Sequence, residues 1–119
     1  MAQKANHRET IIEIAKGCAG VLNSKKAQDF ILLDLQKINS YLDFFLIATG
    51  NSHVHCKSLA KEVRKYLNSI NKAERNVPDM ESEWIILDYN EIIIHIFTER
   101  MREFYQLEKL WADAEVIPI

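Results

Sequence analysis

Two runs rich in isoleucine flank a short polar break in the segment Glu83-Trp84-Ile85-Ile86-Leu87-Asp88-Tyr89-Asn90-Glu91-Ile92-Ile93-Ile94-His95-Ile96-Phe97. β-Branched and aromatic residues favour strands, and Asn90 tolerates the left-handed conformation that a tight turn needs. The segment therefore predicts a β-hairpin. From Asn76 to Thr98 the sequence holds no Lys or Arg but five acids, namely Asp79, Glu81, Glu83, Asp88 and Glu91. The hairpin thus places Trp84 and Tyr89 among negative charges.

The composition indicates one globular domain over residues 1–119. Of the 119 residues, 48% are hydrophobic and 27% are charged, which is enough apolar material for a single core. The longest apolar run is far too short to span a membrane, and the N-terminus lacks the apolar core of a signal peptide. We therefore expect a cytoplasmic protein with no membrane contact, and with Cys18 and Cys56 as reduced, packed thiols. The net charge of -2 gives no chain-wide reason to bind nucleic acid.

Hydrophobic periodicity predicts an α/β fold in the order α-β-β-α-β-β-β-α, with a mixed β-sheet flanked by helices. The expected elements are a helix over 8–22, strands over 29–35 and 43–49, a long helix after residue 52, a strand over 73–77, the hairpin and a helix after residue 98. Asn6 and Glu9 suggest a capping box, and Ser52 and Thr98 suggest N-caps. The last helix is expected to dock on the sheet through Phe104, Tyr105, Leu107 and Trp111.

No catalytic or cofactor-binding pattern emerges from the sequence. With three glycines, the chain has neither a P-loop nor a dinucleotide-binding fingerprint. His53, His55 and Cys56 are the candidate metal cluster, but helical spacing turns His55 away and leaves two ligands where zinc takes three or four. Gly50-Asn51-Ser52 after a strand resembles the opening of the nucleotidyltransferase fold. That chemistry needs paired acids on the next strand, and the nearest pair, Asp79-Met80-Glu81, lies in an apparent loop. We predict no enzyme activity, no metal and no cofactor.

A basic stripe follows the predicted helix after Ser52 and comprises Lys57, Lys61, Arg64 and Lys65. Such a stripe on an outer helix face is most often only solvated, and this is the favoured interpretation. Contact with RNA phosphate is the alternative.

Four blocks of the sequence, in order and spacing, resemble the ribosomal silencing factor family, also called the iojap family. They are Asp43-Phe44-Phe45-Leu46-Ile47-Ala48-Thr49-Gly50-Asn51-Ser52, Trp84-Ile85-Ile86-Leu87-Asp88-Tyr89, His95-Ile96-Phe97 and Arg102-Glu103-Phe104-Tyr105-Gln106-Leu107-Glu108-Lys109-Leu110-Trp111-Ala112-Asp113-Ala114. The resemblance implies a nucleotidyltransferase-like α/β fold without catalytic acids. It also implies binding to large ribosomal subunit protein fourteen, which blocks joining of the small subunit and represses translation when nutrients are short.

Two segments depart from the family pattern. The family commonly has Glu-Gly before the tryptophan strand and Gly-Asp in the hairpin turn, where this chain has Asp79-Met80-Glu81-Ser82-Glu83 and Asn90-Glu91. The change in the turn is conservative, because Asn also tolerates a positive φ.

The hairpin is the expected partner-binding surface, because ribosomal proteins are typically basic and aromatic side chains carry much of an interface's energy. The candidate partner-binding residues are Trp84, Ile85, Asp88 and Tyr89. Strand alternation puts Trp84, Ile86 and Asp88 on one face and Ile85, Leu87 and Tyr89 on the other. A core position for Trp84 is the equally weighted alternative.

Three functions are carried forward from the sequence. The leading one is a non-enzymatic factor that prevents subunit association. The alternatives are a divergent nucleotidyltransferase and an RNA-binding module that uses the basic stripe. The oligomeric state stays open, a homodimer included.

Overall fold

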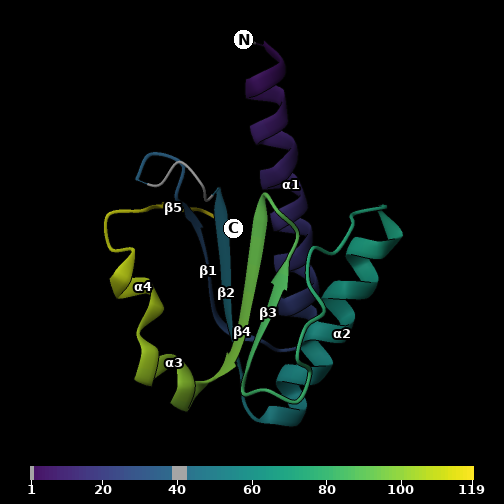
Figure 1. Ribbon diagram of the computed structural model, residues 1–119, viewed down its shortest axis with the longest axis vertical. Coiled ribbons are helices and arrows are strands. Elements are labelled where there is room, and N and C mark those ends of the chain that lie inside the picture. Colours follow the sequence, from purple (N-terminus) through teal and green to yellow (C-terminus); the bar gives the residue numbers. More distant parts are fainter. Residues whose placement is uncertain (1, 39–42) are drawn as a thin grey trace.

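The computed structural model describes residues 2–38 and 43–119 and arranges them around a five-stranded sheet (Figure 1). In chain order the elements are α1 (Ala2–Ser24), β1 (Gln28–Asp34), β2 (Phe44–Gly50), α2 (His53–Ser69), β3 (Trp84–Asp88), β4 (Ile92–Thr98), α3 (Glu99–Tyr105), α4 (Leu107–Leu110) and β5 (Glu115–Ile117). The predicted α/β class, a mixed sheet flanked by helices, is confirmed. The predicted hairpin is also present, and Asn90 in its turn has a φ of 72°.

The sheet has the strand order β3-β4-β2-β1-β5. β2 and β4 are parallel, and the other neighbouring strands are antiparallel. The central ladder runs from Phe44 opposite Ile92 to Gly50 opposite Thr98. Both central strands are buried along almost their whole length, which explains why their sequences are continuous apolar runs.

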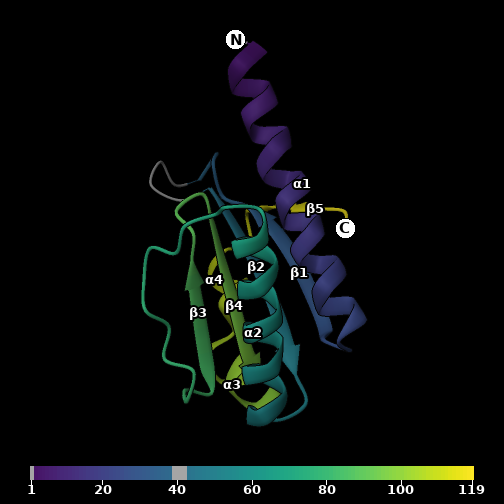
Figure 2. The same ribbon diagram turned by 90° about the vertical axis from the view of Figure 1, so that its right-hand side faces the viewer.

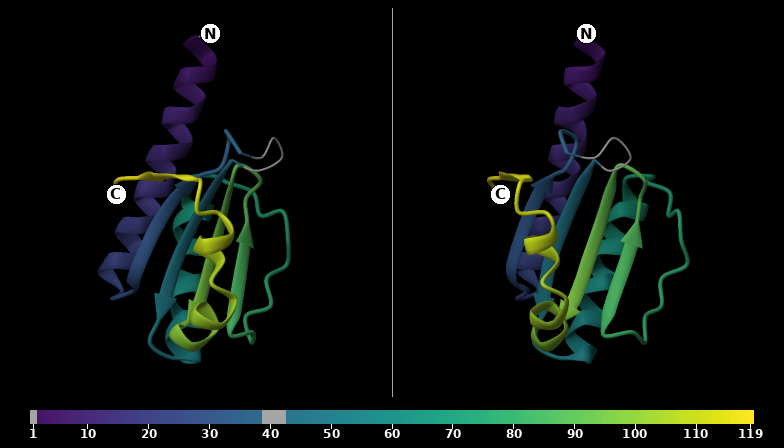
Figure 3. Two further views of the ribbon diagram at one scale, coloured as in Figure 1. Left: turned by 90° about the vertical axis from the view of Figure 1, so that its left-hand side faces the viewer. Right: turned by 60° about the vertical axis from the view of Figure 1, so that its left-hand side comes forward.

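Helices cover both faces of the sheet (Figures 2 and 3). α1 and α2 lie on one face, where they bury Ile11, Ala15, Cys18 and Leu22 from α1 and Cys56, Leu59, Ala60, Val63 and Leu67 from α2. α3 and α4 lie on the opposite face, where Leu107 and Trp111 join a smaller cluster with Phe45, Ile47 and Phe97. Both cysteines are free and buried, and burial raises the pKa of Cys18 to about 12. The thiols are therefore packed, as predicted.

The helix boundaries confirm two predicted caps and correct a third. Ser52 Oγ accepts a hydrogen bond from the His55 N–H at 3.0 Å, and Thr98 Oγ1 accepts one from the Met101 N–H at 3.4 Å. The capping box at Asn6 and Glu9 is wrong, because α1 already begins at Ala2. The residues before Asn6 are mostly good helix formers, so nothing there stops the helix.

The strand predicted over 73–77 is not formed. This segment runs along the outer edge of β3 and bonds to it at single points rather than through a ladder. The Arg75 N–H donates to the Asp88 carbonyl, while the Asn76 side chain donates to the Ile86 carbonyl and accepts from the Asp88 N–H. Because the Asn76 side chain takes the place of backbone groups in this pairing, the segment does not form the regular backbone ladder of a strand.

The single C-terminal helix that the sequence predicts is divided into α3 and α4. The division falls at Gln106, which takes the left-handed conformation with a φ of 47°. After the break Leu107 is buried and Trp111 packs on the sheet, while Phe104 is 77% exposed. The chain then adds β5, which pairs with β1 and was not predicted. The observed order is therefore α-β-β-α-β-β-α-α-β.

A close contact at the end of β2 makes Gly50 a sensitive position. A Cβ on Gly50 would lie 2.6 Å from Cys56 Sγ and 3.0 Å from the Cys56 backbone nitrogen, whereas a Cβ on Gly20 in α1 meets nothing within 4 Å. We expect Gly50→Ala to lower the free energy of unfolding by about 2 kcal/mol, because the first turn of α2 must move. Gly20→Ala is the matched control and should raise it by up to about 1 kcal/mol. Urea unfolding of both variants measures this. Equal stability of Gly50→Ala and the parent would contradict the close packing.

Candidate functional site

The structure separates the four candidate partner-binding residues into two pairs. Trp84 and Asp88 share the outer face of β3 with Ile86, which is 38% exposed. Ile85 and Tyr89 lie on the inner face, in the core beneath α1 and α2, and are 0% and 4% exposed. The predicted alternation is thus confirmed. Ile85 and Tyr89 offer no exposed surface to a partner, so the candidate surface keeps Trp84 and Asp88.

Tyr89 has a structural role that its position in the hairpin did not reveal. Its hydroxyl donates a hydrogen bond to Glu74 Oε1 at 3.3 Å, and the same carboxylate is held by the Arg64 guanidinium. Burial, reinforced by the Glu74 carboxylate, raises the pKa of Tyr89 to about 12. The ring therefore ties the hairpin to α2 and to the segment that follows α2.

Trp84 is half-buried at the border between the smaller core cluster and the surface. Its ring centroid lies 5.3 Å from that of Phe97 and 4.7 Å from that of Tyr105, and its Nε1–H donates to His95 Nδ1 at 3.1 Å. Phe104 packs edge-on against Tyr105, with ring centroids 5.0 Å apart. We call the contiguous set of Trp84, Tyr105 and Phe104 the aromatic ridge.

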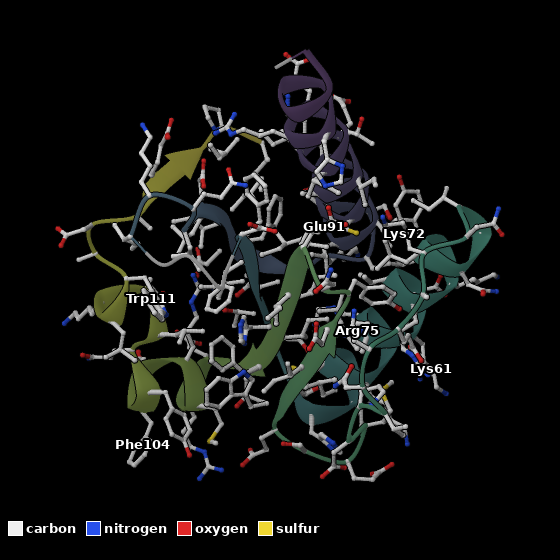
Figure 4. The ribbon with its side chains drawn as sticks, turned by 45° about the horizontal axis from the view of Figure 1, so that its top comes forward. Lys61, Lys72, Arg75, Glu91, Phe104 and Trp111 are labelled. Carbon is white, nitrogen blue, oxygen red and sulfur yellow. The ribbon has the colours of Figure 1, made fainter. Side chains whose placement is uncertain are left out.

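The aromatic ridge corrects the expectation that Phe104 and Tyr105 dock on the sheet. Phe104 is 77% and Tyr105 44% exposed, and Figure 4 shows Phe104 at the outer side of α3. Neighbouring residues on a helix point about 100° apart, so two adjacent aromatic residues rarely face the same sheet. That spacing was a signal in the sequence that one of the two is exposed.

The acidic field of the hairpin is smaller than the sequence implied, because other elements supply counter-charges. Ion pairs join Lys57 to Glu81, Arg100 to Glu83, and Lys72 to Glu91. Within residues 7–38 and 43–119, Asp79 and Asp88 form no ion pair. Asp88 Oδ1 accepts the Asn90 N–H at 2.8 Å, which shapes the turn. Asp88 is therefore the uncompensated acid on the outer face of β3, about 13 Å along the strand from Trp84.

A family model described as ribosomal silencing factor during starvation matches residues 8–119. The chain belongs to the ribosomal silencing factor family. It is 33% identical over 110 residues to the ribosomal silencing factor RsfS of Bacillus subtilis, with 91% of this chain and 90% of that protein covered. It is also 28% identical to an Iojap-related mitochondrial protein of Arabidopsis thaliana, covering 87% of this chain and 56% of that protein. A crystal structure from Chromobacterium violaceum has a TM-score of 0.81 at 31% identity and covers 86% of both chains.

The four blocks that resemble the silencing factor family come together in the fold. They form β2 and its turn, β3, the end of β4, and the α3–α4 segment. β3, β4 and β2 are successive neighbours in the sheet, and α3 and α4 cover the face of these strands that carries Trp84. The segments that carry the resemblance therefore build the aromatic ridge and its support.

In this silencing factor, His53, His55 and Cys56 do not come together as a metal site. His55 Nδ1 accepts the Asn51 N–H at 2.9 Å, and its Nε2–H donates to the Lys25 carbonyl at 2.8 Å. His55 therefore ties the β2–α2 turn to the end of α1. In the described part of the chain, no group of three or more His, Cys, Asp or Glu side chains is placed to hold a metal ion.

No helix in residues 2–38 and 43–119 combines the length and the hydrophobicity needed to cross a membrane.

His95 supports the aromatic ridge from inside the protein. It is 5% exposed, packs against Phe45 with ring centroids 4.5 Å apart, and accepts the Trp84 indole N–H through Nδ1. The proton of the neutral ring is therefore on Nε2, which has no hydrogen-bond partner among the described residues. Burial lowers the pKa of His95 to about 4, so the ring stays neutral at physiological pH.

This buried histidine should make the fold sensitive to acid. In the unfolded chain His95 is protonated below about pH 6.5, whereas in the folded protein it is protonated only below about pH 4. The stabilisation that comes from keeping His95 neutral is therefore fully present above pH 6.5, and it is lost as the pH falls towards 4. We expect the free energy of unfolding to fall by about 2 kcal/mol between pH 7 and pH 5 because of this histidine. His95→Gln keeps an acceptor for Trp84 and should lose that part of the pH dependence in urea unfolding. Parallel pH profiles of parent and variant would contradict the assignment.

Proposed function

We propose that the protein represses translation by binding the large ribosomal subunit through its protein fourteen and blocking the small subunit from joining. It acts in the cytoplasm, without enzymatic turnover, when nutrients are short. Membership of the ribosomal silencing factor family supports a role at the ribosome. The surface assignment rests on the outer face of β3 together with α3, because these two elements present the aromatic ridge and the uncompensated Asp88.

The aromatic ridge has the features of an interface anchor. Tyr and Trp are enriched among the residues that carry most binding energy, because their large rings lose little conformational entropy on binding. Trp84 is held by the His95 hydrogen bond and by Phe97 and Tyr105, so its ring is already fixed in the free protein. A partner therefore gains contact area without first ordering that side chain.

Asp88 adds charge complementarity to this anchor. A carboxylate without an ion pair attracts a basic ribosomal protein, raises the rate of encounter and disfavours acidic partners. The paired acids Glu81 and Glu83 contribute less, because Lys57 and Arg100 already offset their charge. The surface therefore combines a fixed apolar contact with one charged group that is free to pair.

A steric block requires only that the bound protein occupies the joining face. The domain measures 43 × 32 × 24 Å. Atoms of two touching surfaces lie only about 4 Å apart, so a protein of this size bound between the two subunits would keep their surfaces from touching. No catalytic group is needed for this effect. Inhibition should therefore follow occupancy of the large subunit and end when the protein dissociates.

Sedimentation of purified ribosomal subunits tests the proposal. The full chain is added to large subunits alone, to small subunits alone, or to both before magnesium-induced joining. We expect the protein to migrate with free large subunits, to be absent from small subunits and to reduce the joined fraction in proportion to its concentration. Migration with joined ribosomes, or joining that is unaffected at saturating protein, would refute the proposed function.

A further inference from the structure

A hollow of 430 Å³ lies between α2 and the segment that follows it. The side chains that line it include four cations and an amide, namely Lys61, Arg64, Lys65, Lys72 and Asn68, together with one acid, Glu74. Figure 4 shows Lys61, Lys72 and Arg75 on this side of the molecule, whereas Phe104 and Trp111 lie on the other side. The hollow is therefore separate from the aromatic ridge, and the proposed function does not use it.

Positive charge dominates this hollow, because its one lining carboxylate is already engaged. The carboxylate of Glu74 receives two hydrogen bonds from the Arg64 guanidinium and a third from the Tyr89 hydroxyl. Lys61 and Lys65 are exposed and form no ion pair with any residue in the described part of the chain. Lys72 is 3.9 Å from a Glu91 oxygen and is thus only weakly compensated. The hollow therefore favours an anionic occupant.

The arrangement of the cations suits an extended anion better than a compact one. Lys61 and Lys65 lie four residues apart on α2 and are displaced by about 6 Å along the helix, whereas Lys57, one turn earlier, is paired with Glu81. Of the four cations of α2, Lys57 and Arg64 are paired with carboxylates, while Lys61 and Lys65 form no ion pair in the described part of the chain. A single phosphate reaches only part of such a row, whereas the backbone of a nucleic acid presents a phosphate at every nucleotide.

We propose that the α2 basic groove, formed by Lys61, Arg64, Lys65, Asn68 and Lys72, binds the phosphate backbone of RNA without reading its sequence. The inference rests on the proposed function in one respect, because the large ribosomal subunit supplies RNA next to the docked protein. Lysine ammonium groups and the Asn68 amide are suitable donors to phosphate oxygens. The aromatic ring in the hollow, Tyr89, is buried and bonded to Glu74, so it offers no face for stacking on bases.

Fluorescence anisotropy with naked RNA tests this groove in the full chain. The probe is a labelled RNA duplex of about 16 base pairs, titrated at several salt concentrations. Lys61→Glu/Lys65→Glu is compared with Lys37→Glu/Lys109→Glu, which has the same charge change at exposed lysines outside the groove. We expect the groove variant to bind about tenfold more weakly or worse, with a salt slope reduced by about two. The control should change affinity less than about twofold, and both variants should keep the parent's thermal transition.

Three results would overturn the inference. The parent fails to bind the duplex, or both double variants lose affinity equally, which would show only an effect of net charge. Alternatively, inorganic tripolyphosphate binds the groove saturably while RNA does not, which would assign the site to a small phosphate ligand. Normal sedimentation with large subunits, combined with no RNA binding, refutes this inference alone. The converse result refutes the proposed function alone.

Discussion

Asp88→Lys is expected to weaken binding of the protein to the large ribosomal subunit about thirtyfold, which corresponds to about 2 kcal/mol. The substitution replaces attraction to a basic partner by like-charge repulsion at a contact that is partly desolvated. It should leave the fold intact, because Asp88 contributes one side-chain hydrogen bond to the turn, from the Asn90 N–H. The backbone bond from Tyr89 to Ile92 still closes the hairpin. Sedimentation with large subunits measures the loss, and the thermal transition reports the fold.

Two further variants separate the charge of Asp88 from its other properties. Asp88→Asn keeps an acceptor for the Asn90 N–H but removes the charge, so its affinity should fall between those of the parent and Asp88→Lys. Glu13→Lys makes the same charge change on α1, which lies on the opposite face of the sheet, and should bind like the parent. If Asp88→Lys binds large subunits and blocks joining as the parent does, the outer face of β3 is not the interface. Trp84→Ala is less decisive, because it also removes core contacts and the bond to His95.

Arg102→Ala should lower the free energy of unfolding by about 3 kcal/mol, the largest loss of stability expected from a single substitution considered for this chain. The Arg102 side chain is 13% exposed and joins three elements to α3. Its guanidinium donates to the Asp29 carbonyl, to Thr49 Oγ1 at 2.7 Å and to Glu108 Oε1 at 2.8 Å. Removing it leaves the buried Thr49 hydroxyl and the partly buried Glu108 carboxylate without their donor, and it unties α3 from β1 and β2.

Arg100 provides a control for Arg102 on the same helix. Its side chain is 76% exposed and pairs with Glu83, so Arg100→Ala should change stability by less than about 1 kcal/mol. Urea unfolding followed by tryptophan fluorescence compares the two variants, since Trp84 and Trp111 both pack in the cluster that α3 and α4 cover. Arg102→Ala should also weaken binding to the large subunit, because α3 carries Phe104 and Tyr105. Equal stability of the two arginine variants would show that Arg102 does not anchor α3.

Local signals in the sequence were enough to predict most of the fold. The alternation in β3, the turn at Asn90 and the caps at Ser52 and Thr98 depend on neighbouring residues, and all are found in the structure. The errors arise where residues distant in the sequence determine the local conformation. Asn76 bonds to β3 through its side chain, so the expected strand over 73–77 does not form.

The candidate site shows the same division between local and distant effects. The sequence identified Trp84 and Asp88, because strand alternation and residue type place them on an outer face. It overestimated the acidic field, since Lys57, Lys72 and Arg100 come from other elements and their pairing depends on the tertiary fold. Tyr89 was assigned to the surface on its residue type, whereas alternation already placed it on the inner face with Ile85.

The bonds that Arg75 and Asn76 make to β3 also hinder the addition of a strand from another molecule to this edge of the sheet. An exposed edge strand presents unpaired N–H and carbonyl groups on which a strand from another molecule can add. Here the Asp88 N–H and the carbonyls of Ile86 and Asp88 are already bonded to the segment that runs along this edge. The opposite edge is β5, which is only three residues long. The bonded edge of β3, and the part of β1 that β5 covers from Leu32 to Asp34, therefore offer little template for intermolecular strand addition, which should lower the tendency to amyloid-like aggregation even though the central strands are rich in isoleucine.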